Sequence, residues 1–289
     1  MKKNEVYEKV TAAIIEQLEN GIVPWKAEWF CGSQPINYFT GKRYSGYNSF
    51  SLQFDMALRG WADHRFAGFK QIKDAGGKVI KGSQSVMVMY VSEKRAEPEA
   101  GQERGKLLYV KCGTRPVFNI AAQTTGIELP PLSIKTVEFT PLEAAENVVS
   151  SYKDCPPIQR KGTMAYYAPK KDIVVMPEYF NSMEAYYGTL FHELGHSTGH
   201  VSRLARQGVT GKNTFYSKSY GKEELVAELI SVMLCGECGL DVDIDNHAAY
   251  VAGWLTAIKD DRSILVKAAS QAATARDYIL GNPAIQSID

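Results

Sequence analysis

Hydrophobic positions along this chain follow helical spacing in three stretches. Near the amino terminus, apolar residues recur every four positions, as on one face of an amphipathic helix: Val6, Val10, Ile14 and Leu18. The run 183–200 contains no proline and few helix breakers, and Asn181 and Glu184 are spaced like a capping box before it. Residues 222–234 are densely apolar. Three helices are therefore predicted, and the last should be mostly buried.

Other segments have the short, β-rich character of strands. Residues 164–168 and 172–176 flank Pro169, Lys170 and Lys171, which predicts a hairpin. Residues 85–91 also predict a strand, and the glycine-rich stretch 76–82 before it lacks the spacing of a phosphate-binding loop, so a turn is favoured there. Helices and separate small sheets together predict an α+β fold.

The chain is expected to form two domains. Its 289 residues, 45% hydrophobic and 22% charged, suit a globular protein of that size. The proline-containing stretch 129–136 precedes Thr140 and Pro141, which have the pattern of a capped helix start. We therefore predict a small basic α/β domain at 1–130 and a mainly helical domain with a small sheet at 137–289. A fragment ending near Leu132 is expected to fold alone.

The net charge of +1 hides an asymmetry between these two parts. Residues 1–130 hold 18 basic and 13 acidic residues, whereas the rest of the chain holds 15 and 19. The positive excess falls within 42–81, where basic and aromatic residues alternate, as in proteins that bind single-stranded DNA through phosphate contacts and base stacking. The candidate DNA-binding residues are Lys42, Arg43, Tyr44, Trp61, Arg65, Lys70, Lys73, Lys78 and Lys81. The alternative is that the aromatic residues belong to the core.

Three features indicate a cytoplasmic protein that does not enter a membrane. No apolar run approaches the roughly 20 residues that span a bilayer, and the first residues do not form a signal peptide. The 5 cysteines are an odd, scattered set, which suggests a reducing compartment. Cys235 and Cys238 form a lone CxxC pair, for which a core position is favoured over a redox or zinc site.

The most specific chemistry lies in the HExxH motif at 192–196. His192 and His196 are one helical turn apart, so both can reach a single metal ion, and Glu193 is placed to act as a general base. An accidental match should occur in roughly one chain of this length per hundred, but the helical context makes an accident less plausible. A zinc site with catalytic Glu193 is therefore expected.

A catalytic zinc needs a third protein ligand. Ser202 occupies the third histidine position of the longer HExxHxxGxxH pattern, and His200 can serve only if the helix breaks at Gly199. The pair Glu224 and Glu228 on the next helix resembles the gluzincin plan, in which one glutamate binds zinc and a second acid supports the first histidine. We assign Glu224 as ligand and Glu228 as support, with the reverse as the alternative, and expect Glu223 to be solvated.

If the site hydrolyses peptides, zinc would polarise the substrate carbonyl while Glu193 transfers the proton to the leaving amine. A further group should stabilise the oxyanion. The candidates are Tyr220, Tyr216, His200 and His247.

Both halves of the chain resemble ArdC-type antirestriction proteins. In the first half the resemblance lies in GIVPW at 21–25, YSGYN at 44–48, FKQ at 69–71 and VFN at 117–119, and this part is also similar to the amino-terminal part of plasmid TraC primases. In the second half it lies in YY at 186–187, HELGHSTG at 192–199, SRL at 202–204 and EELVAE at 223–228, as in a zincin-like metallopeptidase domain. The chain departs from the gluzincin NExxSD pattern at Glu223 and Glu228.

The resemblance implies single-stranded DNA binding and protection of incoming plasmid DNA from restriction during conjugation. It also implies a protein substrate, for which a component of a restriction system is a candidate. Two other interpretations stay open: a DNA-binding protein whose metal site is structural, and a peptidase that cleaves a repressor-type regulator. A Glu193 variant that folds but loses protection would exclude the structural interpretation.

Overall fold

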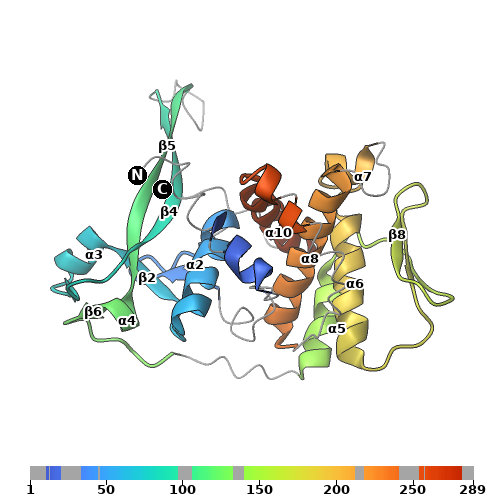
Figure 1. Cartoon of the computed structure of the whole chain (residues 1–289), viewed down its shortest axis with the longest axis horizontal. Coiled ribbons are helices and arrows are strands. Elements are labelled where there is room, and N and C mark those ends of the chain that lie inside the picture. Colours follow the sequence, from blue (N-terminus) through green and yellow to red (C-terminus); the bar gives the residue numbers. More distant parts are fainter. Residues whose placement is uncertain are drawn as a thin grey trace, which may run out of the picture.

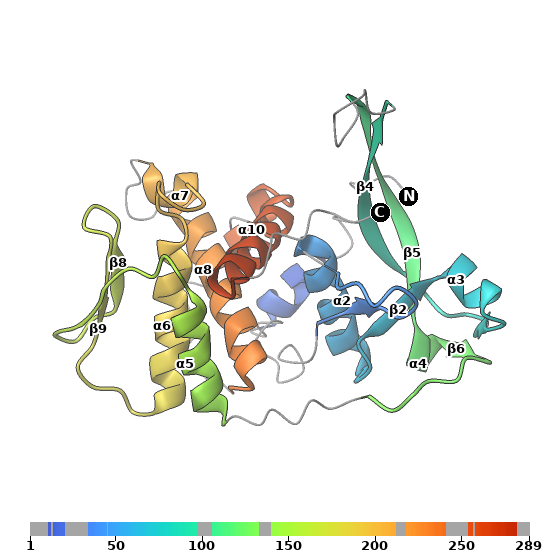
Figure 2. The same ribbon diagram turned by 180° about the vertical axis from the view of Figure 1, so that it is seen from behind.

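The computed structural model describes most of the chain and divides into a part rich in strands and a part rich in helices (Figure 1). The described residues are 11–12, 14–20, 34–44, 46–96, 106–132, 140–211, 218–240, 254–256 and 258–281. Viewed from behind, helix α2 lies between the strand-rich part and helix α10 (Figure 2). This arrangement confirms the predicted α+β fold.

A four-stranded sheet organises the amino-terminal part, in the order β1-β2-β5-β4. Its strands are β1 (Ile36–Asn37), β2 (Arg65–Gly68), β4 (Val86–Arg95) and β5 (Leu107–Asn119). Only β1 and β2 run parallel, and β4 and β5 extend well past them as a long antiparallel arm (Figure 1). The predicted strand at 85–91 is thus the first part of β4.

Short elements surround this sheet. They are α2 (Gly46–Arg59), α3 (Phe69–Asp74), α4 (Ile120–Gln123), and the paired strands β3 (Lys78–Val79) and β6 (Thr124–Thr125). Turns at the two ends of the stretch 76–82 flank β3, a short strand that was not expected there, and Gly76 and Gly82 have φ values of 80° and 90° that favour glycine.

Helices dominate the carboxyl-terminal part. They are α5 (Pro141–Ser151), α6 (Met183–Ser197), α7 (Gln207–Thr210), α8 (Lys218–Cys238) and α10 (Ile264–Ile279). A three-stranded sheet lies beside α6 in the order β7-β9-β8, with bounds Ile158–Arg160, Ile173–Met176 and Tyr166–Ala168. Strands β8 and β9 are antiparallel, which confirms the predicted hairpin.

The starts of α5 and α6 follow from local sequence. Thr140 and Glu143 form a reciprocal capping box at the start of α5, where the side chain of Thr140 accepts from the backbone N–H of Glu143. On α6 the cap is Ser182, one residue later than predicted, and α6 ends at Ser197. His200 therefore lies beyond the helix. Helix α8 is longer at both ends than the apolar run at 222–234 indicated.

One hydrophobic core joins the two parts. Ile14 and Leu18, and Phe50 and Phe54 of α2, belong to the same buried cluster as residues of α6, α8 and α10. At the amino-terminal end of α2, Gly46 lies beside Ser270 of α10. The division at 129–136 stays a prediction, but a fragment ending near Leu132 would expose these four apolar side chains, so it is not expected to fold well alone.

None of the described helices combines the length and apolar character needed to cross a bilayer.

Candidate metal centre

Helices α6 and α8 approach each other closely because small residues line their contact. A Cβ added to Gly195 would lie 3.3 Å from the side chain of Ile230 and 3.4 Å from the Cα of Ala227. Nearby, the Ser231 hydroxyl donates a 2.8 Å hydrogen bond to the carbonyl of Gly188. This spacing brings polar side chains of α8 within reach of the HExxH histidines of α6.

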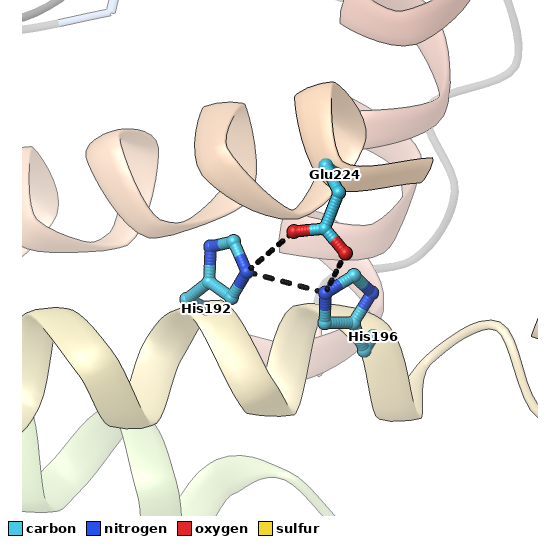
Figure 3. Close-up of side chains that lie close together, drawn as sticks. All are labelled: His192, His196 and Glu224. Atoms are coloured by element: carbon cyan, nitrogen blue, oxygen red, sulfur yellow. Dashed lines mark hydrogen bonds and ion pairs between the residues drawn. The ribbon is translucent and has the colours of Figure 1, made fainter. Parts of the chain in front are cut away.

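His192, His196 and Glu224 converge at this contact (Figure 3). The two Nε2 atoms are 3.2 Å apart, and the Glu224 oxygens lie 3.4 Å from Nε2 of His192 and 3.5 Å from Nε2 of His196. Tetrahedral coordination with bonds of 2.0–2.1 Å requires ligand atoms about 3.3 Å apart. The two histidine nitrogens have this spacing, each faces a different oxygen of Glu224, and one ligand atom from each of the three residues lies within 4.8 Å of the others, which is close enough to hold one metal ion.

The other nitrogen of each imidazole faces a carboxylate. Nδ1 of His192 lies 3.7 Å from Oε2 of Glu228, and Nδ1 of His196 lies 3.4 Å from Oε1 of Glu223. These acids favour the tautomer with the proton on Nδ1, so both Nε2 lone pairs are directed at the same point. Two lone pairs and a carboxylate oxygen around one point fit a divalent cation. The described residues hold no other comparable cluster.

Charge is concentrated in the metal-free site. Burial alone would lower the pKa of His192, but Glu224 and Glu228 outweigh it and raise the pKa well above its usual range. Burial would likewise lower the pKa of His196, but its partners Glu223 and Glu224 outweigh this effect and raise the pKa to about 9. Burial favours protonated Glu224, yet hydrogen bonds from both histidines hold its pKa well below the usual range. Without bound metal, both histidines therefore favour the protonated form at neutral pH, while Glu224 stays ionised.

Metal binding is expected to release protons at pH 7, because a histidine must be neutral to bind a metal. The sign follows from the raised pKa values: apparent affinity should increase with pH through the range in which the histidines lose their protons, which for His196 lies at about 9. Calorimetric titration of the metal-free protein with Zn²⁺ in two buffers of different ionisation enthalpy measures the protons released. Binding without proton release at pH 7 would show that both imidazoles are already neutral.

The structure brings the predicted metal-site residues close together. Glu193 follows the first histidine and is only 7% exposed, and its charge contributes to the raised pKa of His192. Glu224 faces both Nε2 atoms, whereas Glu228 faces Nδ1 of His192, which favours Glu224 as ligand and Glu228 as support. The two assignments stay predictions until metal binding is measured.

The expectation that Glu223 is solvated is wrong. Its side chain is buried, and both of its oxygens accept hydrogen bonds from Arg206 at 2.5–3.2 Å. Sequence reasoning missed Arg206 altogether. A buried acid beside a metal ligand in an apolar helix requires a cation or donors, and that requirement was the signal that could have found it.

The oxyanion candidates are less well placed or lie outside the described residues. His200 is beyond the end of α6, where its Nδ1 lies 2.8 Å from the Ser202 hydroxyl, and it is not part of the metal cluster. Its role as a ligand is therefore not supported. Tyr216 and His247 lie outside the described residues, as does the side chain of Tyr220.

The candidate DNA-binding residues fall into three groups. Six cationic side chains are exposed: Lys42, Arg43, Lys70, Lys73, Lys78 and Lys81. Tyr44 and Trp61 are half-buried and pack against the core beneath the sheet. Arg65 is 8% exposed and forms a bidentate pair with Asp63 while donating to the carbonyl of Pro130. Because its guanidinium is already paired and buried, Arg65 is removed from the candidate set.

Comparison with known proteins agrees with both halves of this structure. A family model described as a zincin-like metallopeptidase matches residues 143–271, and one described as the N-terminal domain of anti-restriction factor ArdC matches residues 4–118. The fold and the His/His/Glu cluster thus define a protein with a zincin-like metallopeptidase domain.

Relatives that match nearly the whole chain identify the family. The metal-free and Mn(II)-bound crystal structures of the antirestriction ArdC protein from plasmid R388 are each 34% identical, with a TM-score of 0.72. The match to the metal-free structure covers 94% of this chain and 96% of the relative's chain. The match to the Mn(II)-bound structure covers 96% of this chain and 98% of the relative's chain. The chain belongs to the ArdC-type family of antirestriction proteins.

Two further relatives extend the comparison. The protein y4eC of Sinorhizobium fredii is 32% identical over 95% of this chain and 91% of its own length. A DNA primase TraC of Escherichia coli is 34% identical over 96% of this chain, which spans only 27% of the primase. The matched region is therefore a module that also occurs within a much longer protein.

Proposed function

We propose that this protein protects incoming plasmid DNA from restriction by combining single-stranded DNA binding with a metal-dependent peptidase site. The observation that carries the proposal is the convergence of His192, His196 and Glu224 on one position, with an acid behind each imidazole. Zinc suits two imidazoles and a carboxylate, and the Mn(II)-bound relative supports a divalent ion more generally.

A catalytic site is favoured over a purely structural one. Structural zinc sites use four protein ligands, whereas catalytic sites use three and leave one position open. The described residues provide three, and the side chains of His192 and His196 keep 23% and 14% of their surface exposed. A substrate can therefore approach the point that the ligands surround.

The chain's own groups can then divide the work of peptide hydrolysis. A bound divalent metal would supply Lewis acidity to the substrate carbonyl. Glu193 would accept a proton from the attacking water and return it to the leaving amine. In the described part of the chain, β8 pairs only with β9, so its other edge can hold an extended peptide by strand addition. The protein substrate would be a component of a restriction system.

The amino-terminal part offers cationic and aromatic side chains that can contact single-stranded DNA. Lys70 and Lys73 lie on α3, beside Phe69, whose side chain is 55% exposed. On the long arm, the guanidinium of Arg115 lies 4.2 Å from the ring centre of Tyr90. Cations would contact phosphates, and rings or guanidinium planes would stack on unpaired bases. Little preference among base sequences is expected from such a surface.

The two activities can be separated with one set of variants. Replacing Lys70, Lys73, Lys78 and Lys81 together with alanine should weaken binding to single-stranded DNA. The slope of log affinity against log salt concentration should become shallower by about 0.7 for each phosphate that the variant no longer neutralises. Gel shifts on single strands and duplex at several salt concentrations measure both quantities. The matched control is Lys170→Ala with Lys171→Ala, which removes two exposed lysines from the β8–β9 turn and should change neither.

Glu193→Gln completes the set, since it should retain DNA binding and metal but lose protection of DNA entering by conjugation. Full protection by this variant would show that peptide hydrolysis is not needed, and would favour a structural metal. Equal affinity of the wild-type protein for duplex and single strands would contradict the DNA-binding part of the proposal. Protection that depends on Glu193 while no restriction component is cleaved would favour a repressor-type regulator as the substrate.

A further inference from the structure

A buried arginine lies behind one of the two histidine ligands. Arg206 immediately precedes α7 and is 6% exposed. Its Nε and Nη2 atoms donate to the carboxylate of Glu223, and Oε1 of Glu223 lies 3.4 Å from Nδ1 of His196. Arg206, Glu223 and His196 therefore form a continuous chain of polar contacts that ends at the Nε2 lone pair facing Glu224.

The same arginine also holds the end of the helix that carries both histidines. Its Nη2 donates to the carbonyl of Gly195 at 2.8 Å, and its Nη1 donates to the hydroxyl of Thr198 at 2.5 Å. A cation at a helix carboxyl terminus satisfies free carbonyls and interacts favourably with the helix dipole. Arg206 thus fixes the backbone of His196's turn and the acid behind its side chain at once.

The surrounding backbone is shaped to admit this arrangement. A Cβ on Gly208 would lie 2.7 Å from Glu223, and a Cβ on Gly199 would lie 3.1 Å from Nη2 of Arg206 and 2.4 Å from Val209. Two glycines in the segment between α6 and α8 thus allow it to pack directly on the Arg206–Glu223 pair.

We infer that Arg206, acting through Glu223, is a positioning residue for the metal ligand His196. This inference rests on the proposed metal-binding function. Glu223 and Glu224 are neighbours, and both carboxylates are buried beside the histidines. By engaging both oxygens of Glu223, Arg206 keeps that carboxylate on the Nδ1 side of His196 and leaves Glu224 as the acid that faces the metal position.

The charges of the site lead to the same conclusion. Glu193, Glu223, Glu224 and Glu228 are all buried near one divalent ion's position. Among the lysine and arginine side chains in the described part of the chain, that of Arg206 forms an ion pair with one of these acids, Glu223. Glu228, behind the other histidine, has instead a buried Oε1 without a hydrogen-bond partner among the described residues. Among the described residues, the acid behind His196 thus has an arginine partner, whereas the acid behind His192 has neither lysine nor arginine paired with it.

The test compares Arg206→Met with Arg203→Met. Arg203 belongs to the same segment, has an equally buried side chain, donates to the carbonyl of Ser197 at the end of α6, and pairs with Asp172 away from the ligands. We expect Arg206→Met and Glu223→Gln each to weaken Zn²⁺ binding about 10–100-fold, the usual effect of removing the support of a metal ligand. Arg203→Met should lower stability and leave Zn²⁺ affinity unchanged.

Three further measurements distinguish positioning from a general loss of structure. The double variant Arg206→Met with Glu223→Gln should bind Zn²⁺ no more weakly than either single variant, because both act through one path. The absorption spectrum of bound Co²⁺ should change in the Arg206 and Glu223 variants only. Arg206→Lys keeps the positive charge but loses the paired guanidinium donors, so it should bind Zn²⁺ more tightly than Arg206→Met and more weakly than the wild-type protein. If Arg206→Met does not fold, Arg206→Lys takes its place in the test.

Wild-type affinity and an unchanged Co²⁺ spectrum in Arg206→Met would overturn the inference, as would equal weakening in Arg203→Met or additive losses in the double variant. If the wild-type protein itself binds neither Zn²⁺ nor Co²⁺, the proposed metal-binding function fails with it. Wild-type binding with unaffected variants would leave that function standing and remove only the role of Arg206.

Discussion

Zn²⁺ binding is expected to fall by roughly three orders of magnitude in His192→Ala, His196→Ala or Glu224→Ala. Structural zinc sites bind with about 10–16 kcal/mol, so removing one of three ligands should cost on the order of 4 kcal/mol, close to a thousand-fold. In Figure 3 each histidine faces the other's Nε2 atom and one of the two oxygens of Glu224. Competition with a chromophoric chelator, together with metal analysis of the purified variants, measures the loss.

Two variants separate ligands from neighbouring groups. Glu193→Ala should keep its metal, because Glu193 is not one of the clustered ligands, and should lose only chemistry. Glu228→Ala should weaken binding about 10–100-fold, as expected for a group that supports a ligand through its second nitrogen. Full occupancy in Glu224→Ala combined with loss in Glu228→Ala would reverse the two assignments.

The part of the site that the sequence predicts depends on local spacing. Histidines at i and i+4 share a helix face whatever the rest of the fold does, so the pairing of His192 with His196 follows from their spacing alone. Glu224 and Glu228 share a face of their own helix in the same way. Bringing the two helices together required a resemblance to known metallopeptidases, because periodicity within one helix does not identify its neighbour.

What the sequence did not predict depends on contacts between distant residues. Arg206 and Glu223 are 17 positions apart, and nothing in the local pattern of either shows the other. The basic stretch around Arg65 predicts a phosphate ligand, but the partners of Arg65 include Asp63 and the carbonyl of Pro130, 65 positions away. Composition counts charges, whereas only the fold shows which charges are already paired.

The shared hydrophobic core is another feature that depends on contacts between distant residues. The charge of residues 42–81 assigns them to the amino-terminal domain, yet the buried face of α2 within that stretch packs toward α10. An amphipathic pattern predicts that a helix has a buried face, but it does not specify which partner covers that face. The metal site and the candidate DNA surface therefore belong to parts of the molecule that share one hydrophobic core.

Phe54→Ala is accordingly expected to destabilise both parts of the protein. Phe54 is 2% exposed within the shared core, and removing a buried phenylalanine side chain typically costs about 3–5 kcal/mol. Urea unfolding followed by circular dichroism should show one transition in the wild-type protein and one in the variant, at lower urea. Phe39→Ala is the control, because Phe39 is 39% exposed and its loss should change stability by no more than about 0.5 kcal/mol.

Hydrogen exchange distinguishes a shared core from two independent ones. If α2 and the carboxyl-terminal helices form one cooperative unit, Phe54→Ala should reduce protection of both β2 (residues 65–68) and β9 (residues 173–176) by similar free energies. Loss of protection in β2 with β9 unchanged would show that the parts unfold separately, and would restore the expectation that a fragment ending near Leu132 folds alone. Because Phe54 and residues of β9 belong to one buried cluster with α6, α8 and α10, an effect on β9 would show that this shared core couples the two parts.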